Sequence, residues 1–325
     1  MADLFALAGQ NLLSPIVLSF ILGLAAALAK SDLSVPEAAA KALSIYLLFA
    51  IGFKGGVSIA DHGVDASLVM SLIAGLILSA ALPVIAFGLL LTLTKMDRLN
   101  AAAVAGHYGS ISIVTFVAGT SVLESQGIVA EGYMVAVAAA MEAPAILTAL
   151  WLASRGSGSG RMDGDLWREV LLNGSIVLLV GSFAIGWATG AEGLKEIESF
   201  IVSPFKGVLC LFLLDMGLLA GRGMQSGRGS LGLGAVAFGL LMPLIGSLAG
   251  LGAGLLLGLS TGGVMLLMVL SASASYIAVP AAMRVALPEA NPSIYLTLSL
   301  GVTFPFNLVL GIPLYLAMAR FATGG

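Results

Sequence analysis

Two short stretches place hydroxyl side chains inside otherwise apolar sequence. The first, AGHYGSISIVTF, contains Ser110 and Ser112, and the second, LSASASYIAVP, contains Ser271, Ser273 and Ser275. Polar side chains within a membrane are costly unless they face protein or water. Small residues also let helices pack closely, but two such stretches at matching places favour a binding site at which each helix is broken.

A broken helix offers both kinds of polar backbone group. The half that begins presents free N–H groups, which attract an anion, and the half that ends presents free C=O groups. Carbonyl and hydroxyl oxygens suit a hard cation such as Na⁺. Pro280 favours a break, because a proline leaves the carbonyl four residues earlier, that of Tyr276, without its usual partner. The two stretches therefore predict a site that couples a small anion to sodium.

One carboxylate lies within the apolar sequence. Glu142 stands beside Pro144, and an ionisable residue inside a membrane is a functional candidate by default. It is a candidate Na⁺ ligand or proton carrier, and the alternative is a hydrogen-bonded structural carboxylate near a helix junction. The equivalent position in the second half of the chain is Thr303, and with nearby Asn307 it offers neutral oxygen ligands.

Three further charged or titratable residues need an interpretation. Lys54 and Asp215 lie in matching apolar runs, AIGFKGG and LLDMGLLAG, and are candidates for a gate or a subunit interface. For Lys54 we favour the alternative, a side chain that reaches out to the membrane surface. His107, next to Tyr108, is a candidate pH sensor, although a single histidine in a helix is more often structural.

The elements that carry these residues are membrane helices. The chain has 325 residues, of which 59% are hydrophobic and only 10% are charged, and its mean hydropathy is +1.08. A soluble domain would carry about a quarter charged residues. The net charge of −3 gives no indication of nucleic-acid binding, and the single Cys210 excludes an internal disulfide and a cysteine-based metal cluster. The sequence contains no Walker A or HExxH motif, and we predict no enzyme and no transition-metal site.

Ten apolar runs are long enough to cross a bilayer, whose core of about 30 Å requires roughly 20 residues per helix. The predicted spans are 11–29, 39–59, 67–93, 99–122, 131–153, 169–189, 199–220, 230–258, 262–284 and 293–321. These runs do not alternate in the manner of barrel strands. The fold class predicted is therefore an all-α polytopic membrane protein of about ten transmembrane helices.

Basic residues predict the orientation. With the N-terminus outside, the inner loops hold ten of the fourteen Lys and Arg residues, so both termini are predicted to lie outside the cytoplasm. The longest polar loop, 154–168, is a glycine- and serine-rich cytoplasmic linker between the two halves.

The two halves, 1–153 and 169–325, are predicted to be repeats. Pro83 and Pro243 are 160 residues apart, Pro144 and Pro305 are 161 apart, and the second offset brings the two serine stretches into register. Each half has five spans, and because five is odd the second half enters the membrane from the opposite side. Inverted repeats are a recurring build of secondary transporters, with the substrate near the midplane.

Several segments resemble the sodium-dependent bicarbonate transporter family, SbtA type. They are GSISIVTFVAGTSVLE, MEAPAI, SASASYIAVPAAMR, PEANPSIYL and GVTFPFN, and the resemblance extends over nearly all of the chain. It implies broken helices that cross in spans four and nine, a core domain and a gate domain, and import of bicarbonate with Na⁺ by an elevator-like movement. It further implies a homotrimer in the bacterial inner membrane and a PII-like regulatory protein on the cytoplasmic face.

Carried over by motif, the resemblance implies two overlapping sets of ligands and no cofactor beyond the coupling ion. The substrate set is Gly109, Ser110, Ser112, Ser271, Ala272 and Ser273. The sodium set is Ser110, Ser112, Thr115, Glu142, Ser273, Ser275, Thr303 and Asn307, with Tyr108, His107 and Tyr276 as neighbours. The short central loop and His107 depart from the family pattern.

Two alternatives stay open at this point. One is Na⁺-coupled symport of another small anion, such as a carboxylate, which requires an apolar pocket beside the N–H groups. The other is an anion channel or a membrane receptor that does not translocate its ligand, and saturable, sodium-dependent uptake distinguishes a carrier from both.

Overall fold

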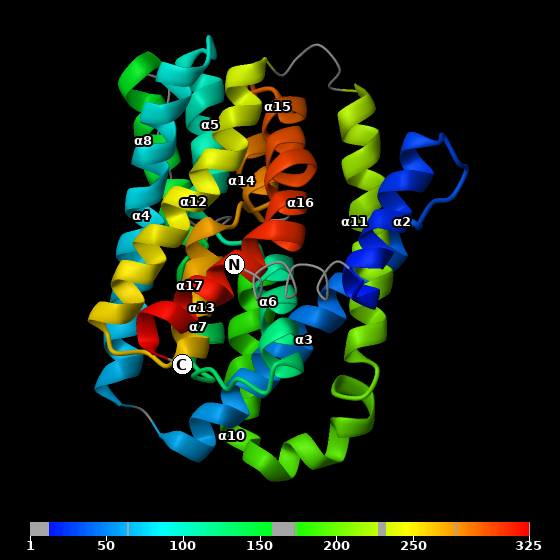
Figure 1. Ribbon diagram of the computed structural model, residues 1–325, viewed down its shortest axis with the longest axis vertical. Helices are drawn as coiled ribbons and strands as arrows, with labels where there is room; N and C mark the ends of the chain where they lie inside the picture. The colour runs from blue at the N-terminus through cyan, green and yellow to red at the C-terminus, as the bar shows by residue number, and fades with distance from the viewer. Residues whose placement is uncertain are drawn as a thin grey trace.

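The chain is helical throughout the part that the structure describes. The computed structural model describes residues 13–63, 65–157, 172, 174–226, 232–276 and 278–324, and these contain helices and no strand (Figure 1). The all-α prediction is confirmed for this part of the chain. Most of the predicted linker, 158–168, lies outside the described residues, as does the N-terminus up to residue 12.

The described part of the first half contains seven helices. They are α2 (Pro15–Leu28), α3 (Glu37–His62), α4 (Ala66–Leu93), α5 (Arg98–Gly109), α6 (Ile113–Ser125), α7 (Met134–Ala140) and α8 (Ala143–Ser157).

The described part of the second half contains five separate helices followed by one continuous run. The separate helices are α10 (Gly174–Ile201), α11 (Phe205–Ser226), α12 (Leu233–Leu256), α13 (Thr261–Ala272) and α14 (Ala278–Ala286). The run changes between α- and π-helical geometry along its length: α15 (Pro292–Leu296), η1 (Thr297–Thr303), α16 (Phe304–Phe306), η2 (Asn307–Gly311) and α17 (Ile312–Thr323).

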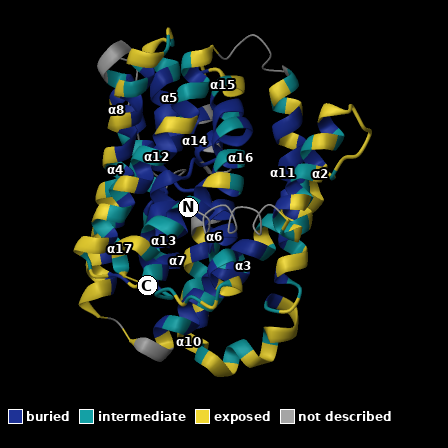
Figure 2. Cartoon of the chain, in the orientation of Figure 1, coloured by how far each residue is buried: buried dark blue, intermediate teal, exposed yellow. Residues whose placement is uncertain are grey.

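Length and apolar composition make these helices suited to a membrane. Eight helical runs among the described residues are long and apolar enough to cross one, and α2 and α13 are shorter apolar helices. The most apolar stretch of the run over α5 and α6 is fully buried inside the protein, whereas outer helices such as α4 and α10 expose large apolar side chains. Figure 2 shows this contrast, with buried residues at the centre and exposed ones on the outer helices. Lipid is the solvent that an exposed apolar surface of this kind requires.

The segment between the sixth and seventh predicted spans is helical and not a loop. The sixth span was predicted to end at 189, and the helix breaks one residue later, but helical backbone then continues to Ile201 and α11 begins at Phe205. The helix turns at Gly190, whose φ of 58° suits a residue without Cβ. The segment after the turn carries Glu192, Lys195 and Glu196 and runs across the base of the molecule in Figure 1. Its charges explain why hydropathy alone assigned it to a loop.

The helices pack as two groups. The flanking group consists of α2, α3, α10 and α11, in which α3 packs along α10 and α2 along α11. Both contacts depend on glycine: a Cβ on Gly23 or Gly217 would meet the facing backbone of the α2–α11 pair at 2.0 and 2.1 Å. Gly56 and Gly186 make the same close approach between α3 and α10. The remaining helices, α4 to α8 and α12 to α17, form the site group.

Contacts within the site group come in corresponding pairs. Helix α4 packs on α5 as α12 packs on α13, and α5 packs on α8 as α13 packs on α17. The two halves also meet directly, through α4 with α12 and α6 with α13. This arrangement brings the two serine stretches together in the buried centre.

Candidate functional site

The first serine stretch interrupts a helix. Helix α5 ends at Gly109, and Ser110 and Ser112 have extended backbone, with ψ of 145° and 108°. The Ser112 hydroxyl then accepts a hydrogen bond from the Thr115 N–H at 3.3 Å and so caps α6. A serine hydroxyl satisfies one of the N–H groups that a starting helix leaves free. The break predicted in span four is confirmed.

The second stretch interrupts its helix in the same way. Helix α13 ends at Ala272, Ser273 is extended with ψ of 163°, and α14 begins at Ala278. The break predicted in span nine is therefore also confirmed. Tyr276, within this break, is buried and packs edge-on against the Phe304 ring, with 5.3 Å between ring centroids.

The two breaks contact each other through hydrogen bonds. The Ser112 N–H donates to the Ser273 hydroxyl at 2.9 Å, and the Ser275 N–H donates to the His107 carbonyl at 2.8 Å. The His107 ring returns a bond from Nδ1 to the Ser275 carbonyl at 2.6 Å. A carbonyl only accepts, so Nδ1 carries the hydrogen. The ring also stacks on Tyr295, with centroids 4.5 Å apart, and these contacts give His107 a structural role in joining the breaks.

Several buried polar atoms at the breaks have no hydrogen-bond partner within the described residues. The hydroxyls of Ser110 and Ser271 are two of them, on residues that are 0% and 2% exposed, and Nε2 of His107 is a third. Ser110 and Ser271 are 161 residues apart, which is the offset predicted between the two halves. Buried polar groups are almost always hydrogen-bonded. Two exceptions at matched positions of the two serine stretches make these hydroxyls candidates for ligand binding.

The backbone on either side of Glu142 bonds to Ser79 of α4, and Ser79 also lies close to Gly109 at the end of α5. The carboxylate lies in the short turn between α7 and α8, is 4% exposed, and its Oε2 has no partner among the described residues. The Ser79 hydroxyl donates to the Met141 carbonyl at 2.5 Å and accepts from the Ala145 N–H at 3.2 Å, on either side of Glu142. The Ser79 carbonyl lies 2.7 Å from where a Cβ on Gly109 would stand.

Sequence reasoning missed Ser79, although a signal was present. Pro83 comes four residues later and removes the N–H that would bond the Ser79 carbonyl. The proline therefore marks the place where Gly109 can approach the backbone of α4.

Most polar atoms of Thr303 and Asn307 already form hydrogen bonds within the protein. The Thr303 hydroxyl donates to the Gly239 carbonyl at 2.7 Å and thus accepts from the Tyr108 hydroxyl at 2.7 Å. Gly239 stands four residues before Pro243, so its carbonyl lacks a helical partner. The Asn307 amide donates to the Ala272 carbonyl at 2.9 Å, and its oxygen accepts from Tyr315 at 2.8 Å.

The structure does not bring the other two predicted candidates to the breaks. Lys54 lies on α3 and pairs with Glu124 at 3.5 Å, at the far end of α6. Asp215 is buried on α11, which packs mainly along α2. Both belong to the flanking group.

The chemistry available at the two breaks is that of hydroxyl oxygens, carbonyl oxygens and the starting ends of α6 and α14, and the Glu142 carboxylate lies in the turn whose backbone bonds to Ser79. Oxygen ligands suit Na⁺ and helix starts suit a small anion. Within the described residues, no group of three or more His, Cys, Asp and Glu side chains is placed to hold a metal.

Comparison with known proteins adds one finding. A family model described as the Na⁺-dependent bicarbonate transporter superfamily matches residues 15–320, nearly the whole chain and all of both breaks. No curated protein matches the sequence.

Proposed function

The chain belongs to the Na⁺-dependent bicarbonate transporter superfamily, and on that premise we propose that it imports bicarbonate by symport with Na⁺. It is a multi-pass membrane transporter rather than an enzyme, and the family requires no cofactor beyond the coupling ion. Na⁺ that moves down its concentration gradient supplies the free energy for bicarbonate import.

One observation supports a substrate site at the two helix breaks. The Ser110 and Ser271 hydroxyls are buried, matched between the two halves and without partners in the described chain, at the point where two broken helices meet. Bicarbonate has three oxygens and one negative charge, so it can accept from both hydroxyls and from N–H groups at the starts of α6 and α14. The substrate set is Gly109, Ser110, Ser112, Ser271, Ala272 and Ser273, in which Gly109 and Ala272 contribute backbone.

The sodium ligands come from the same crossing. The Glu142 carboxylate balances the charge of the ion, and hydroxyl and carbonyl oxygens near Ser110, Ser112, Thr115, Ser273 and Ser275 complete its shell. Thr303 and Asn307 support the residues of this shell without contacting the ion directly. Their polar atoms already bond to Gly239, Tyr108, Ala272 and Tyr315.

The fold that we propose is ten transmembrane helices in two inverted five-helix repeats, residues 1–153 and 169–325, joined by the linker 154–168. The matched packing of α4 on α5 and α12 on α13 supports it, as do the paired glycine contacts of the flanking group. The proline pair adds support, since Pro83 and Pro243 each free a carbonyl that the site group uses.

The two helix groups support an elevator movement. The site group carries every polar residue of the crossing, and the flanking group is held together by its own close glycine contacts. We propose that the site group slides along the flanking group, and that the protein forms a homotrimer in the bacterial inner membrane with both termini outside. A PII-like protein on the cytoplasmic face is the regulatory partner that the family resemblance suggests.

The direct test is uptake of ¹⁴C-bicarbonate into proteoliposomes at a pH where bicarbonate dominates over CO₂, with K⁺ replacing Na⁺ in the control. Saturable uptake that requires Na⁺ is the expected result. Competition by unlabelled formate or acetate would identify a broader anion specificity. Uptake that is equal in K⁺, or that does not saturate, would exclude the symporter.

A further inference from the structure

Glu124 joins the two helix groups through two lysines. Its Oε1 lies 3.5 Å from the Lys54 ammonium and its Oε2 lies 3.6 Å from the Lys206 ammonium. Glu124 stands at the end of α6 in the site group, whereas Lys54 and Lys206 stand on α3 and α11 of the flanking group. The three side chains are partly exposed, and together they carry one net positive charge.

The position of Glu124 is unfavourable for its own helix. It is the last residue but one of α6, where the carbonyl ends of the helix repel a negative charge. The lysines compensate for this, and Lys54 is itself placed over the Phe205 ring, 5.4 Å from the centroid. The two ammonium groups are thus arranged around a carboxylate, and that carboxylate comes from the other group of helices.

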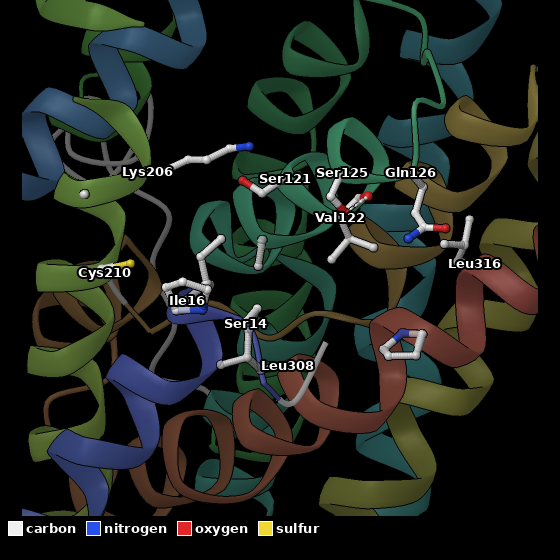
Figure 3. A pocket seen from close by; sticks show the side chains of 14 residues that line it. Ser14, Ile16, Ser121, Val122, Ser125, Gln126, Lys206, Cys210, Leu308 and Leu316 are labelled. Atoms are coloured by element: carbon white, nitrogen blue, oxygen red, sulfur yellow. Dashed lines mark hydrogen bonds between the residues drawn. The ribbon is translucent and has the colours of Figure 1, made fainter. Parts of the chain in front are cut away.

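Members of this cluster line two cavities. Lys206 lines a cavity of about 560 Å³ with Ser121, Ser125 and Gln126. Figure 3 shows the Lys206 side chain reaching from α11 toward Ser121. Lys54 and Glu124 line a second cavity of about 450 Å³. Each is far larger than a hydrated oxyanion requires, so the lysines are accessible to a small ligand.

We propose that Lys54 and Lys206 form an anion-binding site at the boundary between the two helix groups, which the Glu124 carboxylate occupies in this conformation. A carboxylate and bicarbonate both present two oxygens on one carbon with a single negative charge. When α6 moves away, a small oxyanion from solution takes the place of Glu124. The choice of bicarbonate as that oxyanion rests on the proposed function.

Helix α6 connects this site to the crossing of the broken helices. Ser112 caps its start and Glu124 stands near its end, 12 residues later, which is about 18 Å along a helix. Because one helix carries both, a shift of the crossing along the flanking group also withdraws Glu124. The lysines are therefore free to bind an anion when the crossing has moved.

Cys210 provides a reporter, because it is the only cysteine in the chain and lines the same cavity as Lys206, one helical turn away. We would measure its reaction rates with an anionic and a cationic methanethiosulfonate reagent, using the full chain in detergent without Na⁺. Glu124→Gln removes one negative charge, so the anionic reagent should gain and the cationic one should lose roughly twofold each. The matched control is Glu192→Gln, which breaks a glutamate–lysine pair within α10 and should change neither rate.

Binding is then tested with choline bicarbonate at pH 8 against choline chloride of equal ionic strength. In Glu124→Gln, bicarbonate should slow the anionic reagent about threefold and saturably, while the triple variant Glu124→Gln/Lys54→Met/Lys206→Met should lose this effect. Equal rates in bicarbonate and chloride for Glu124→Gln, or unchanged protection in the triple variant, would overturn the proposal. The assay requires no transport, so a failure of sodium-dependent uptake would be distinguishable from it.

Discussion

The backbone N–H of Ser112 donates to the hydroxyl of Ser273 at 2.9 Å, across 161 residues of sequence. The same separation, 161 residues, is the offset that the spacing of Pro144 and Pro305 predicts between the two halves of the chain. Each of the two serines belongs to a helix break, so each break is held by the other. Backbone groups that a break releases are thereby partly satisfied, while the hydroxyls of Ser110 and Ser271 stay available to a ligand.

Ser110→Ala and Ser271→Ala should weaken bicarbonate affinity without unfolding the protein. A hydrogen bond to a charged group contributes about 1.5–3 kcal/mol, and a tenfold change in affinity corresponds to about 1.4 kcal/mol. We therefore expect the KM for bicarbonate to rise roughly 10- to 100-fold in each variant, measured by uptake. Ser247→Ala is the control, because Ser247 is buried but bonds only to a carbonyl of its own helix. A wild-type KM in the double variant Ser110→Ala/Ser271→Ala would contradict the site.

Ser273→Ala should behave differently, because it removes the acceptor of a buried N–H. Leaving that donor unpaired costs about 1–3 kcal/mol, so thermal unfolding in detergent should occur at lower temperature than in the Ser110→Ala variant. Uptake should fall as well, since the two breaks lose a direct bond. Unchanged thermal stability would show that the hydrogen bond between Ser112 and Ser273 does not stabilise the contact between the two breaks.

Glu142→Gln should change the response to sodium. The carboxylate is 4% exposed and its Oε2 has no partner among the described residues, so a cation is the natural counter-charge. The half-saturating Na⁺ concentration should rise about tenfold or more, with bicarbonate present in excess. Asp215→Asn, a buried acid of the flanking group, should leave the sodium curve in place. An unchanged curve in Glu142→Gln would assign that residue a structural role.

Thr303→Val should destabilise the fold more than it alters sodium binding. The variant preserves shape but leaves the Gly239 carbonyl and the Tyr108 hydroxyl without their partner, at a cost of about 1–3 kcal/mol. The unfolding midpoint in a denaturing-detergent titration should drop, and Thr303→Ser should restore it. A shifted sodium curve with normal stability would instead make Thr303 a direct ligand.

Much of the site was predictable because its signals are local. Hydropathy located the eight described helical runs that are long and apolar enough to cross a membrane, and small and hydroxyl residues marked the breaks at Ser110 and Ser273. What local pattern did not indicate was which polar atoms find partners. Thr303 and Asn307 look like free oxygen ligands in sequence, yet their partners Gly239 and Ala272 lie 64 and 35 residues away.

The sequence by itself determined the apolar helices suited to a membrane and the two places where helices break, because apolar run length and hydroxyl content are properties of neighbouring residues. Proline spacing predicts the register of the two halves. Tertiary structure decided the rest. In it, Ser112 forms a hydrogen bond with Ser273, His107 forms one with Ser275, and Glu124 forms ion pairs with Lys54 and Lys206. These pairings depend on how helices distant in sequence approach one another, and buried hydrogen bonds and ion pairs form only where that approach brings donor and acceptor within about 3–4 Å.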